Sequence, residues 1–495
     1  RQRRLRHLRS AVSIQREPRV LIIGAGMSGM LMAIKLIESG MENFQIVDKA
    51  SEIGGTWREN TYPGIACDVA AHYYTYQDVP NPEWSTRLPQ GGEIQKYLLG
   101  VVEKHDLRRR IAFNKEVARA DHDGQRWTVC YQDGEVVEAD FVVACCGLLH
   151  HPRYPDIPGL GDFKGAMFHS ARWDHSVPLE GKRVGVLGTG STGAQIISKL
   201  SERRLDLTVF QRTPQWIFPL PDRHYTQLEK SLLKAFPWVA RIIHHSYRVA
   251  FENLFAAAVL KPCWQRRLMS RLCRWNLNTV KDPALRAKLT PDYQPLCKRL
   301  VMSMEFYPAI QRSNVSLINE DIDHIEARGV VTRDGVLHEL DVLALATGFD
   351  AHAYFRPLEL RNAQGKTLSE AWEHGPYALR TVAVPGFPNF FFTLGPQSPI
   401  GNFSAISISE TQITYILRCI EMFRGGKFRT LSPRAEATEA FNAFIRAAMP
   451  DTIWVTGCTN WYMSKNGVPS AWPYSGKRFR QELREPDLSE FELVA

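Results

Sequence analysis

The chain has 495 residues, of which 44% are hydrophobic and 23% charged, as in an ordinary soluble globular protein with room for two or three domains. No apolar run approaches the roughly 18–20 residues of a membrane-spanning helix, which excludes a membrane span. The net charge of +9 comes mostly from residues 1–19, which hold seven Arg and one Glu. The remainder is close to balanced, so nothing favours a nucleic-acid partner.

The Arg-rich start of the chain, residues 1–17, is expected to be a flexible, solvated basic tail. A transit peptide or an anchor for an anionic surface stays open as the alternative. The nine Cys residues contain no CxxC pair, and no Cys/His cluster has zinc spacing, so we expect no metal site. We expect all nine to be reduced, which predicts a reducing, cytoplasmic location. The sequence does not indicate an oligomeric state.

One sequence pattern occurs twice along the chain. The apolar run 19–23 predicts a buried parallel strand, and a glycine turn, a helical pattern and a second strand ending at Asp48 follow it. The run 183–187 precedes the same three features, and there the second strand ends at Arg212. The glycines, in G-x-G-x-x-G spacing, are Gly24, Gly26 and Gly29 in the first copy and Gly188, Gly190 and Gly193 in the second.

Two complete copies indicate two dinucleotide-binding sites, so we predict an α/β fold with two Rossmann-like domains. The segments 140–147 and 341–348 are apolar strands that end in small-residue turns. We expect both to return the chain to the first sheet, one before and one after the second unit. The second domain would then be inserted into the first.

The residue that ends each second strand indicates the cofactor. Asp48 is a carboxylate that can accept hydrogen bonds from ribose hydroxyls, which suits FAD or NAD. Arg212 can instead bind a 2′-phosphate, so the second site should prefer NADPH over NADH; a surface arginine is the alternative. A flavin and NADPH in one chain indicate electron transfer between them. Because no close Cys pair is present to accept electrons, O2 is the obvious acceptor.

The predicted division of the chain follows from these assignments. It comprises an FAD-binding domain at 18–150 and 336–495 (the latter including the C-terminal region), a linker at 151–182, and an NADP-binding domain at 183–335 with a helical insertion at about 222–290.

Residues 163–174, FKGAMFHSARWD, resemble the fingerprint of the type I Baeyer–Villiger monooxygenases at Phe163, Gly165, His169, Trp173 and Asp174. Family motifs also match GGTWRENTYPGIACD at 54–68 and ATGFD at 346–350. The resemblance covers nearly the whole chain from about residue 18. From 350 onward, with GFPNFFFTLGP and WYMSKNG, it points more loosely to the branch that includes the aryl-ketone monooxygenases.

The resemblance implies that NADPH reduces FAD and that O2 then gives a C4a-peroxyflavin, which converts a ketone into an ester or lactone and also oxidises sulfides. It implies that Arg299 stabilises the negative charge, because Arg stays charged in a desolvated pocket. Lys298 would reach the NADPH 2′-phosphate, and Asp68 would orient Arg299. A solvated basic pair at 298–299 and a turn or cap role for Asp68 are the alternatives.

The role of His169 depends on its neighbourhood. Its unperturbed pKa near neutrality would suit proton transfer. It follows the Pro- and Gly-rich stretch 151–163, however, which resembles an interdomain connection. We therefore expect His169 and Trp173 to act at a hinge, because domain movement often gates such sites.

The predicted catalytic set is Arg299, Asp68, His169 and Trp173. The predicted cofactor-binding set is Gly24, Gly26, Gly29, Asp48, Lys49, Gly55, Thr56, Trp57, Asp68, Gly188, Gly190, Ser191, Thr192, Gly193, Arg212, Thr213 and Lys298. The loop 395–402 is expected near the flavin. The expected partners are a small ketone and O2. An N- or S-oxygenating flavin monooxygenase and an NADPH oxidase are the competing functions.

Overall fold

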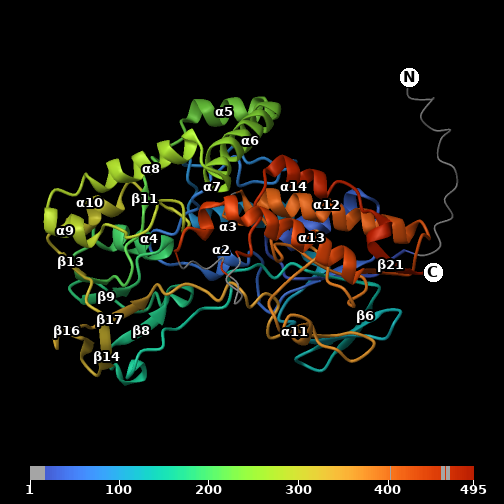
Figure 1. Ribbon diagram of the computed structural model, residues 1–495, viewed down its shortest axis with the longest axis horizontal. Helices are drawn as coiled ribbons and strands as arrows, with labels where there is room; N and C mark the ends of the chain where they lie inside the picture. The colour runs from blue at the N-terminus through green and yellow to red at the C-terminus, as the bar shows by residue number, and fades with distance from the viewer. Residues whose placement is uncertain (1–16, 402, 459–462, 464–468) are drawn as a thin grey trace.

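The computed structural model describes residues 17–401, 403–458, 463 and 469–495. The basic tail expected at 1–17 therefore lies outside the described residues except for Glu17, as does most of the late WYMSKNG stretch. The described chain forms two neighbouring lobes. Figure 1 shows the second sheet with its helices on the left and the C-terminal helices on the right.

The first lobe contains a five-stranded parallel sheet in the order β19-β7-β1-β2-β3. Its strands are β1 (Val20–Ile23), β2 (Phe44–Val47), β3 (Ile111–Ala112), β7 (Phe141–Ala144) and β19 (Phe390–Phe392). Every residue of β1 and β7 is buried, as expected for strands that are covered on both faces. Helix α1 (Met27–Glu38) follows β1 and packs against α12 (Ala405–Arg424).

The second lobe contains another five-stranded parallel sheet, in the order β13-β10-β9-β17-β8. Its strands are β8 (Ala166–His169), β9 (Arg183–Leu187), β10 (Asp206–Phe210), β13 (Val315–Ile318) and β17 (Val342–Leu345). Helix α4 (Ser191–Leu200) follows β9 and packs against α10 (Phe306–Ile310). All five strands lie between β7 and β19 in the chain, so the second lobe is inserted into the first. The predicted fold class is confirmed.

The strand predicted at 341–348 was assigned to the wrong sheet. β17 pairs with β9 and β8 in the second sheet, and β19 returns the chain to the first. An apolar run followed by small residues occurs at the end of both sheets, so the pattern alone cannot identify the pairing partner. The boundary predicted at 335/336 thus falls inside the second lobe. The predicted linker 151–182 is also only partly a linker, because β8 forms the edge of the second sheet.

Smaller elements complete the two lobes. One small sheet consists of the antiparallel strands β4 (Val117–His122), β5 (Trp127–Tyr131) and β6 (Val136–Ala139), with β18 (Glu359–Arg361) parallel to β4. Another consists of the antiparallel strands β14 (Ile322–Glu326), β15 (Gly329–Thr332) and β16 (Leu337–Glu339). The strand pairs are β11 (Ile217–Phe218) with β12 (Val301–Met302), and β20 (Thr430–Pro433) with β21 (Phe491–Val494). The other helices are α2 (Thr56–Glu59), α3 (Gly91–Lys104), α11 (Leu368–Ala371), α13 (Ala435–Ala448) and α14 (Gly476–Glu482).

The region of the expected helical insertion, about 222–290, is helical in the structure. It consists of α5 (Gln227–Ala235), α6 (Pro237–Phe251), a π-helical stretch (Glu252–Ala256), α7 (Ala257–Leu260), α8 (Trp264–Leu277) and α9 (Pro283–Lys288). Thr226 and Glu229 form a capping box at the start of α5, and Pro237 occupies the first turn of α6. Figure 1 shows α5 and α6 projecting from the upper margin. Among the described residues, no helix is long and apolar enough to cross a membrane.

Candidate active site

A cavity of about 680 Å³ lies where the carboxyl ends of both parallel sheets meet. Its walls include the residues that follow β1, β2, β7 and β17, together with the start of α4. Ligands of open parallel sheets bind at this edge of the strands. The cavity brings together many of the predicted site residues: Gly24, Gly26, Asp48, Lys49, Gly55, Thr56, Trp57, Asp68, Gly190, Ser191, Thr192 and Arg299.

The first glycine turn has the geometry that a pyrophosphate requires. A Cβ on Gly24 would lie 2.6 Å from the carbonyl oxygen of Cys145, and one on Gly29 would lie 1.8 Å from that of Gly24, so both positions must be glycine. At Gly26 the nearest atom would be Gly55 Cα at 3.8 Å. Gly26 is also the N-cap of α1 and has no side-chain cap, which leaves backbone N–H groups for an anion.

The second turn repeats this arrangement. A Cβ on Gly188 would lie 2.6 Å from the Ala346 carbonyl oxygen, and one on Gly193 would lie 2.1 Å from that of Gly188. A Cβ on Gly190 would meet nothing within 4 Å. Gly190 caps α4 without a side-chain hydrogen bond, and Ser191 and Thr192 follow it into the cavity wall. Each turn therefore fits a dinucleotide pyrophosphate.

Asp48 is held in place at the end of β2. Its Oδ2 accepts a hydrogen bond from the backbone N–H of Ala25 at 2.7 Å, and its Oδ1 accepts one from Ala50 at 2.8 Å. The carboxylate lines the cavity and keeps lone pairs for further donors. This position and chemistry fit the ribose hydroxyls of a bound dinucleotide.

Arg212 and Lys298 form a second cationic position outside the main cavity walls. Burial lowers the pKa of Lys298, the nearby Arg212 lowers it further, and Asp292 opposes the shift. Two neighbouring cations repel each other unless an anion lies between them. The Lys298 ammonium also lies 4.6 Å from the centre of the Tyr293 ring. Four further predicted residues also lie outside the cavity walls: Thr213, Gly29, Gly188 and Gly193. The three glycines instead allow close packing of the backbone at the two turns.

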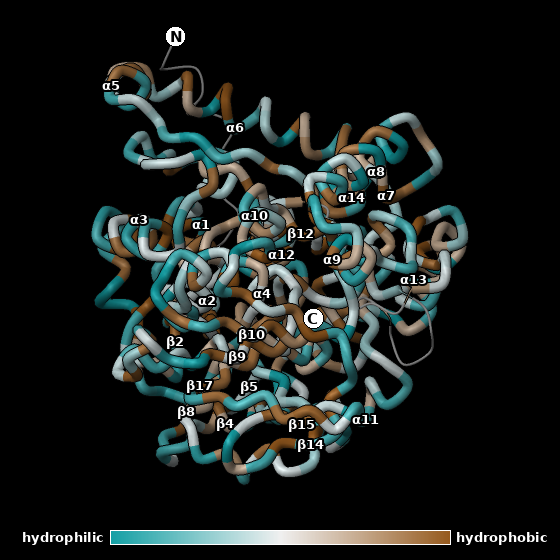
Figure 2. The backbone as a smooth tube through the Cα atoms, turned by 90° about the vertical axis from the view of Figure 1, so that its left-hand side faces the viewer, coloured by the Kyte–Doolittle hydropathy of each residue, from teal (hydrophilic) through white to brown (hydrophobic). Residues whose placement is uncertain are grey.

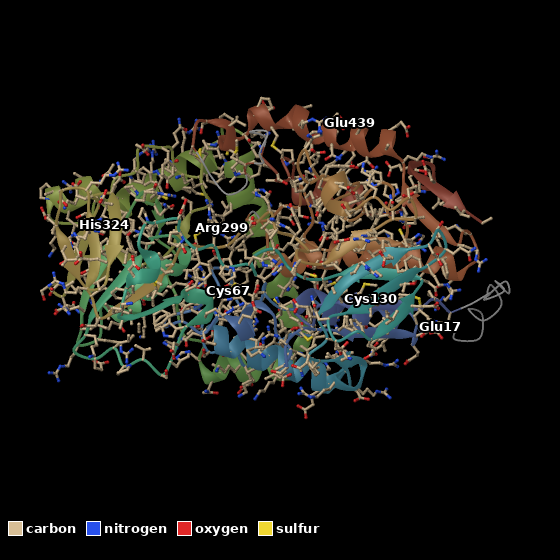
Figure 3. The ribbon with its side chains drawn as sticks, turned by 90° about the horizontal axis from the view of Figure 1, so that it is seen from below. Glu17, Cys67, Cys130, Arg299, His324 and Glu439 are labelled. Carbon is tan, nitrogen blue, oxygen red and sulfur yellow. A yellow bond between two sulfur atoms is a disulfide. The ribbon has the colours of Figure 1, made fainter. Side chains whose placement is uncertain are left out.

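Asp68 and Arg299 meet at the cavity wall. Arg299 Nη2 donates a hydrogen bond to Asp68 Oδ2 at 2.7 Å, and their side chains are 32% and 19% exposed, respectively. Asp68 comes from the loop after α2, whereas Arg299 lies two residues before β12. Figure 3 shows Arg299 near the middle of the molecule, with Cys67 nearby. The predicted pairing of these two side chains is present, and it joins the two lobes.

A smaller cavity of about 40 Å³ shares Asp68 and Arg299 with the large one, and Lys298 also lines it. Most of its remaining wall is apolar and comes from the helical insertion, the 296–302 segment and the C-terminal region: Phe251, Phe255, Val259, Leu296, Leu300, Met302, Phe403 and Trp454. We call this cavity the apolar niche. A fixed guanidinium at the edge of an apolar space suits a small, weakly polar molecule that gains negative charge as it reacts.

The segment that carries Lys298 and Arg299 is fixed from several directions. Leu296 adopts φ +77°, a conformation that a branched side chain rarely takes unless its surroundings impose it. The Tyr293 carbonyl accepts a hydrogen bond from Trp216 Nε1 at 2.7 Å, and the Tyr293 hydroxyl donates to Pro214 at 3.0 Å. Backbone strain of this kind often accompanies functional sites.

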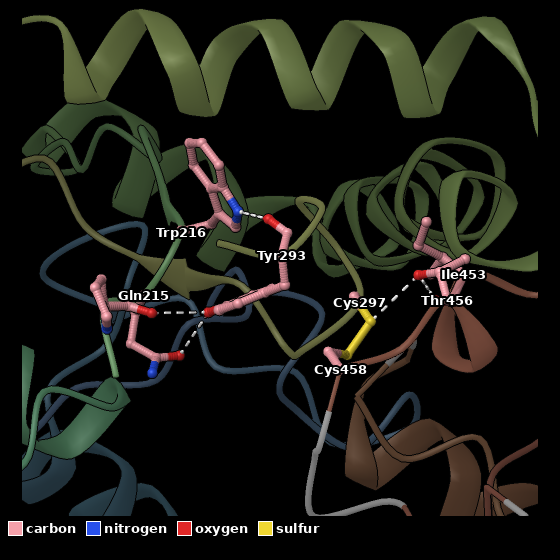
Figure 4. Close-up of a disulfide and its surroundings, with 8 residues drawn as sticks. Gln215, Trp216, Tyr293, Cys297, Ile453, Thr456 and Cys458 are labelled. Atoms are coloured by element: carbon pink, nitrogen blue, oxygen red, sulfur yellow. Dashed lines mark hydrogen bonds between the residues drawn. A yellow bond between two sulfur atoms is a disulfide. The ribbon is translucent and has the colours of Figure 1, made fainter. Parts of the chain in front are cut away.

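A disulfide joins Cys297 to Cys458, so the expectation that all nine cysteines are reduced is wrong. The two residues are 161 positions apart in sequence, with Cα atoms 6.1 Å apart. The absence of CxxC spacing gave no information about so distant a pair, because the fold alone brings them together. Thr456 Oγ1 lies 3.4 Å from the Cys297 sulfur (Figure 4). The bridge therefore ties the C-terminal region to the residue before Lys298.

His169 and Trp173 lie outside both cavities. His169 Nδ1 accepts a hydrogen bond from Ala171 N–H at 3.1 Å, and Nε2 lies 3.0 Å from the Gly348 carbonyl oxygen. Nδ1 is thus the acceptor and Nε2 carries the proton. Burial lowers the pKa of His169, which favours this neutral form. Trp173 is buried against Phe168, with ring centres 4.8 Å apart.

The two connections between the lobes run side by side where His169 binds. Arg153 N–H donates to the Gly348 carbonyl at 2.9 Å, and Asp350 N–H donates to the His151 carbonyl at 2.9 Å. The Gly348 carbonyl oxygen therefore accepts hydrogen bonds from both the His169 side chain and the Arg153 backbone N–H. This arrangement supports positioning of the connections rather than proton transfer to a substrate.

Sequence reasoning missed Gln195 on α4. Its Oε1 accepts a hydrogen bond from the Tyr62 hydroxyl at 2.8 Å, and its Nε2 donates to the Ala66 carbonyl at 2.9 Å. Gln195 thereby joins the 54–68 motif of the first lobe to the second glycine turn. The available signal was its position one helical turn after Ser191, on the same side of α4.

Comparisons with known proteins agree with this geometry. A family model described as flavin-binding monooxygenase-like matches residues 17–360. An uncharacterised monooxygenase from Mycobacterium tuberculosis is 48% identical over 476 residues, covering 96% of each chain. A Baeyer–Villiger monooxygenase from Streptomyces coelicolor is 37% identical over 485 residues, covering 96% of this chain and 92% of its own.

The fold is also similar to that of a solved crystal structure. The crystal structure of OTEMO in complex with FAD and NADP superimposes with a TM-score of 0.87 at 27% sequence identity, covering 97% of this chain and 100% of the other. The resemblance to the Baeyer–Villiger enzymes expected from the 54–68 and 163–174 motifs is thus confirmed. The chain belongs to the flavin-binding monooxygenase-like family and, within it, to the Baeyer–Villiger monooxygenases.

Proposed function

We propose that this protein is an NADPH-dependent flavoprotein that inserts one oxygen atom from O2 beside a ketone carbonyl. The overall reaction consumes ketone, O2, NADPH and a proton and gives an ester or lactone, NADP⁺ and water. The observation that carries the proposal is the Asp68–Arg299 pair at a cavity wall that both glycine turns share. The family membership of the chain supports the same reaction.

The first glycine turn, with Asp48, would hold FAD, and the second, with Arg212 and Lys298, would hold NADPH. Bound FAD, reduced by NADPH, supplies the two-electron chemistry with O2. Thr56, Trp57 and Lys49 line the cavity beside the first turn and would contact the same cofactor. The absence of a carboxylate after β10 removes the group that would repel a 2′-phosphate.

Arg299 would stabilise the negative charge that develops on oxygen during transfer to the carbonyl. A guanidinium keeps its charge when desolvated, and its fixed position avoids reorganisation at the moment of reaction. Asp68 would keep the guanidinium aimed at the cavity and balance its charge in the absence of substrate. The ketone would enter the large cavity beside the pair, and the apolar niche, which is too small for a whole ketone, would add Phe251 and Phe255 to that side of the site.

His169 and Trp173 would position the two connections between the lobes. The nicotinamide must first approach the flavin, and space for O2 and ketone must follow while water stays excluded. A neutral His169 that holds the Gly348 carbonyl would limit the lobes to a few relative arrangements. The aryl-ketone branch, the oxidation of sulfides and a cytoplasmic location stay predictions.

The test is an NADPH-oxidation screen over cyclic, aliphatic and aryl ketones and one thioether, with FAD-saturated enzyme. We expect ketone-dependent NADPH consumption and products heavier than the ketone by one oxygen atom, labelled when ¹⁸O2 replaces O2. Stoichiometric hydrogen peroxide regardless of the ketone would indicate an NADPH oxidase. A sulfoxide product with no ester from any ketone would indicate an S-oxygenating enzyme.

A further inference from the structure

The helical insertion exposes an unusual number of large apolar side chains. Half of the exposed large hydrophobic residues in the described part of the chain lie between Leu228 and Trp275, on α5, α6 and α8 or the α5–α6 junction. Leu228 is 70% exposed and Trp238 is 60% exposed. Single exposed apolar residues are common, but a concentration on adjoining helices marks a surface that contacts something. We call these exposed side chains of α5, α6 and α8 the insertion face.

On α6, the exposed apolar side chains follow one helical stripe. Trp238, Ile242, His245 and Val249 are spaced four, three and four residues apart, which places them on one side of the helix, and each is exposed. The inward side is anchored separately, because His244 is buried and its Nδ1 lies 3.0 Å from the His72 carbonyl oxygen. The outward stripe is therefore not needed for packing of the helix.

The same spacing occurs on α8. Trp264, Leu268, Arg271 and Trp275 are again four, three and four residues apart, and all are exposed. The two tryptophans are 56% and 57% exposed. Figures 1 and 2 both show α5, α6 and α8 along the same upper margin of the molecule.

The insertion face is also strongly basic. Residues 227–277 contain nine Lys and Arg but only two acidic residues. Both acidic residues are already paired, Glu229 with Arg223 and Glu252 with Arg480. Five exposed cations of the segment make no ion pair with any residue that the structure describes: Arg241, Lys261, Arg267, Arg271 and Arg274. Tryptophan and aliphatic side chains among unpaired cations are typical of helices that lie in a membrane interface.

We propose that the insertion face binds the surface of an anionic phospholipid membrane. Lipid phosphates would pair with the free Arg and Lys side chains, while Trp238, Trp264 and Trp275 would enter the headgroup region. A second copy of the chain fits less well, because a symmetric contact would bring two basic faces together. A nucleic acid fits less well because Leu, Ile and Val side chains gain nothing from a phosphate backbone.

The test is sedimentation of the FAD-loaded full-length enzyme with vesicles. Vesicles of equimolar phosphatidylcholine and phosphatidylglycerol are compared with vesicles of phosphatidylcholine alone. We expect a partition coefficient at least ~10-fold higher on the anionic vesicles, falling steeply between ~50 and ~500 mM NaCl. A variant with Trp238→Gln, Trp264→Gln and Trp275→Gln should lose most of this binding, and so should Arg267→Glu with Arg271→Glu.

The control variant carries Val136→Gln and Val336→Gln, two exposed apolar positions outside the insertion. It should bind anionic vesicles like the wild type. All variants should keep wild-type NADPH oxidation with a water-soluble ketone, because none of the changed residues lines either cavity.

Three outcomes would overturn the proposal. The first is no binding to anionic vesicles. The second is full binding by both the tryptophan variant and the Arg267→Glu/Arg271→Glu variant, which would assign the effect to the basic residues 1–16. The third is a lipid-free dimer in analytical ultracentrifugation that the tryptophan variant converts to a monomer, which would assign the face to a second copy.

Discussion

Asp68 and Arg299 lie 231 residues apart in sequence, yet Arg299 Nη2 is 2.7 Å from Asp68 Oδ2. Asp68 belongs to the first lobe. Arg299 belongs to a segment of the second lobe that the Cys297–Cys458 disulfide also holds in place. The pair therefore depends on the relative position of the lobes. This dependence links the arrangement of the domains to the charge at the proposed reaction centre.

Replacing Asp68 with Asn should separate orientation from charge. A neutral amide keeps the size of the side chain but loses the charge-assisted hydrogen bond, which contributes about 1.5–3 kcal/mol. We expect ketone oxygenation to fall roughly 10- to 100-fold while FAD stays bound. Product formation and NADPH consumption are measured together. Wild-type oxygenation in Asp68→Asn would contradict an orienting role for this carboxylate.

Replacing Arg212 with Ala should change the choice of nicotinamide cofactor. Loss of a charge-assisted contact to the 2′-phosphate should lower kcat/KM for NADPH roughly 10- to 100-fold, with little effect on NADH. Lys298→Ala should also lower kcat/KM for NADPH. Burial and the nearby Arg212 lower the pKa of Lys298, so a bound 2′-phosphate would be the anion that stabilises its charged form. Arg204→Ala, at an exposed position before β10, is the control. An equal loss of kcat/KM with NADPH and NADH would show that Arg212 does not bind the 2′-phosphate.

Replacing His169 with Ala should uncouple the enzyme without releasing FAD. The variant loses the contact to the Gly348 carbonyl, so the connections between the lobes should sample more arrangements. We expect hydrogen peroxide to rise at the expense of ester, measured as product formed per NADPH consumed. His169→Gln, which retains an N–H donor, should recover part of the coupling. His324→Ala on β14, where the side chain is 41% exposed, is the matched control. Identical coupling in His169→Ala and this control would exclude the hinge role.

Removing the Cys297–Cys458 disulfide should destabilise the segment that carries Arg299. A bridge that closes a long loop contributes about 2–4 kcal/mol to the free energy of unfolding. Cys458→Ser and Cys297→Ser should each lower the denaturation midpoint, and the double variant should lower it no further, because either change removes the same bond. Thiol labelling of the unfolded, unreduced protein should find seven reactive cysteines. Nine would show that the bridge does not form.

The sequence predicted those features that local patterns encode. The two glycine turns, Asp48 and Arg212 stand at fixed positions after their strands, because a βαβ unit restricts where each can lie. The helical insertion was predictable from long helical patterns with few turn signals. Asp68 and Arg299 could be paired only through the family resemblance, since no local rule joins residues so far apart.

Long-range partners were the features that the sequence did not encode locally. The run 341–348 has the same apolar character as the strands of both sheets, and only its neighbours assign it to the second one. Cys297 and Cys458 meet because the C-terminal region folds back over the second lobe. Gln195 connects the two lobes because it accepts a hydrogen bond from Tyr62, and the position of Tyr62 on the facing lobe depends on how both domains pack.

The central claim concerns the fixed charge of Arg299, and a comparison of two half-reactions tests it most directly. In Arg299→Ala, anaerobic reduction of the flavin by NADPH should proceed at close to the wild-type rate, because no negative charge develops on a transferred oxygen atom in that step. Ester formation should fall by roughly 100- to 1000-fold, with hydrogen peroxide in its place. Arg299→Lys, which keeps a charge without the planar fork, should lie between the two. Ester formation at the wild-type rate in a folded, FAD-saturated Arg299→Ala enzyme would contradict the account.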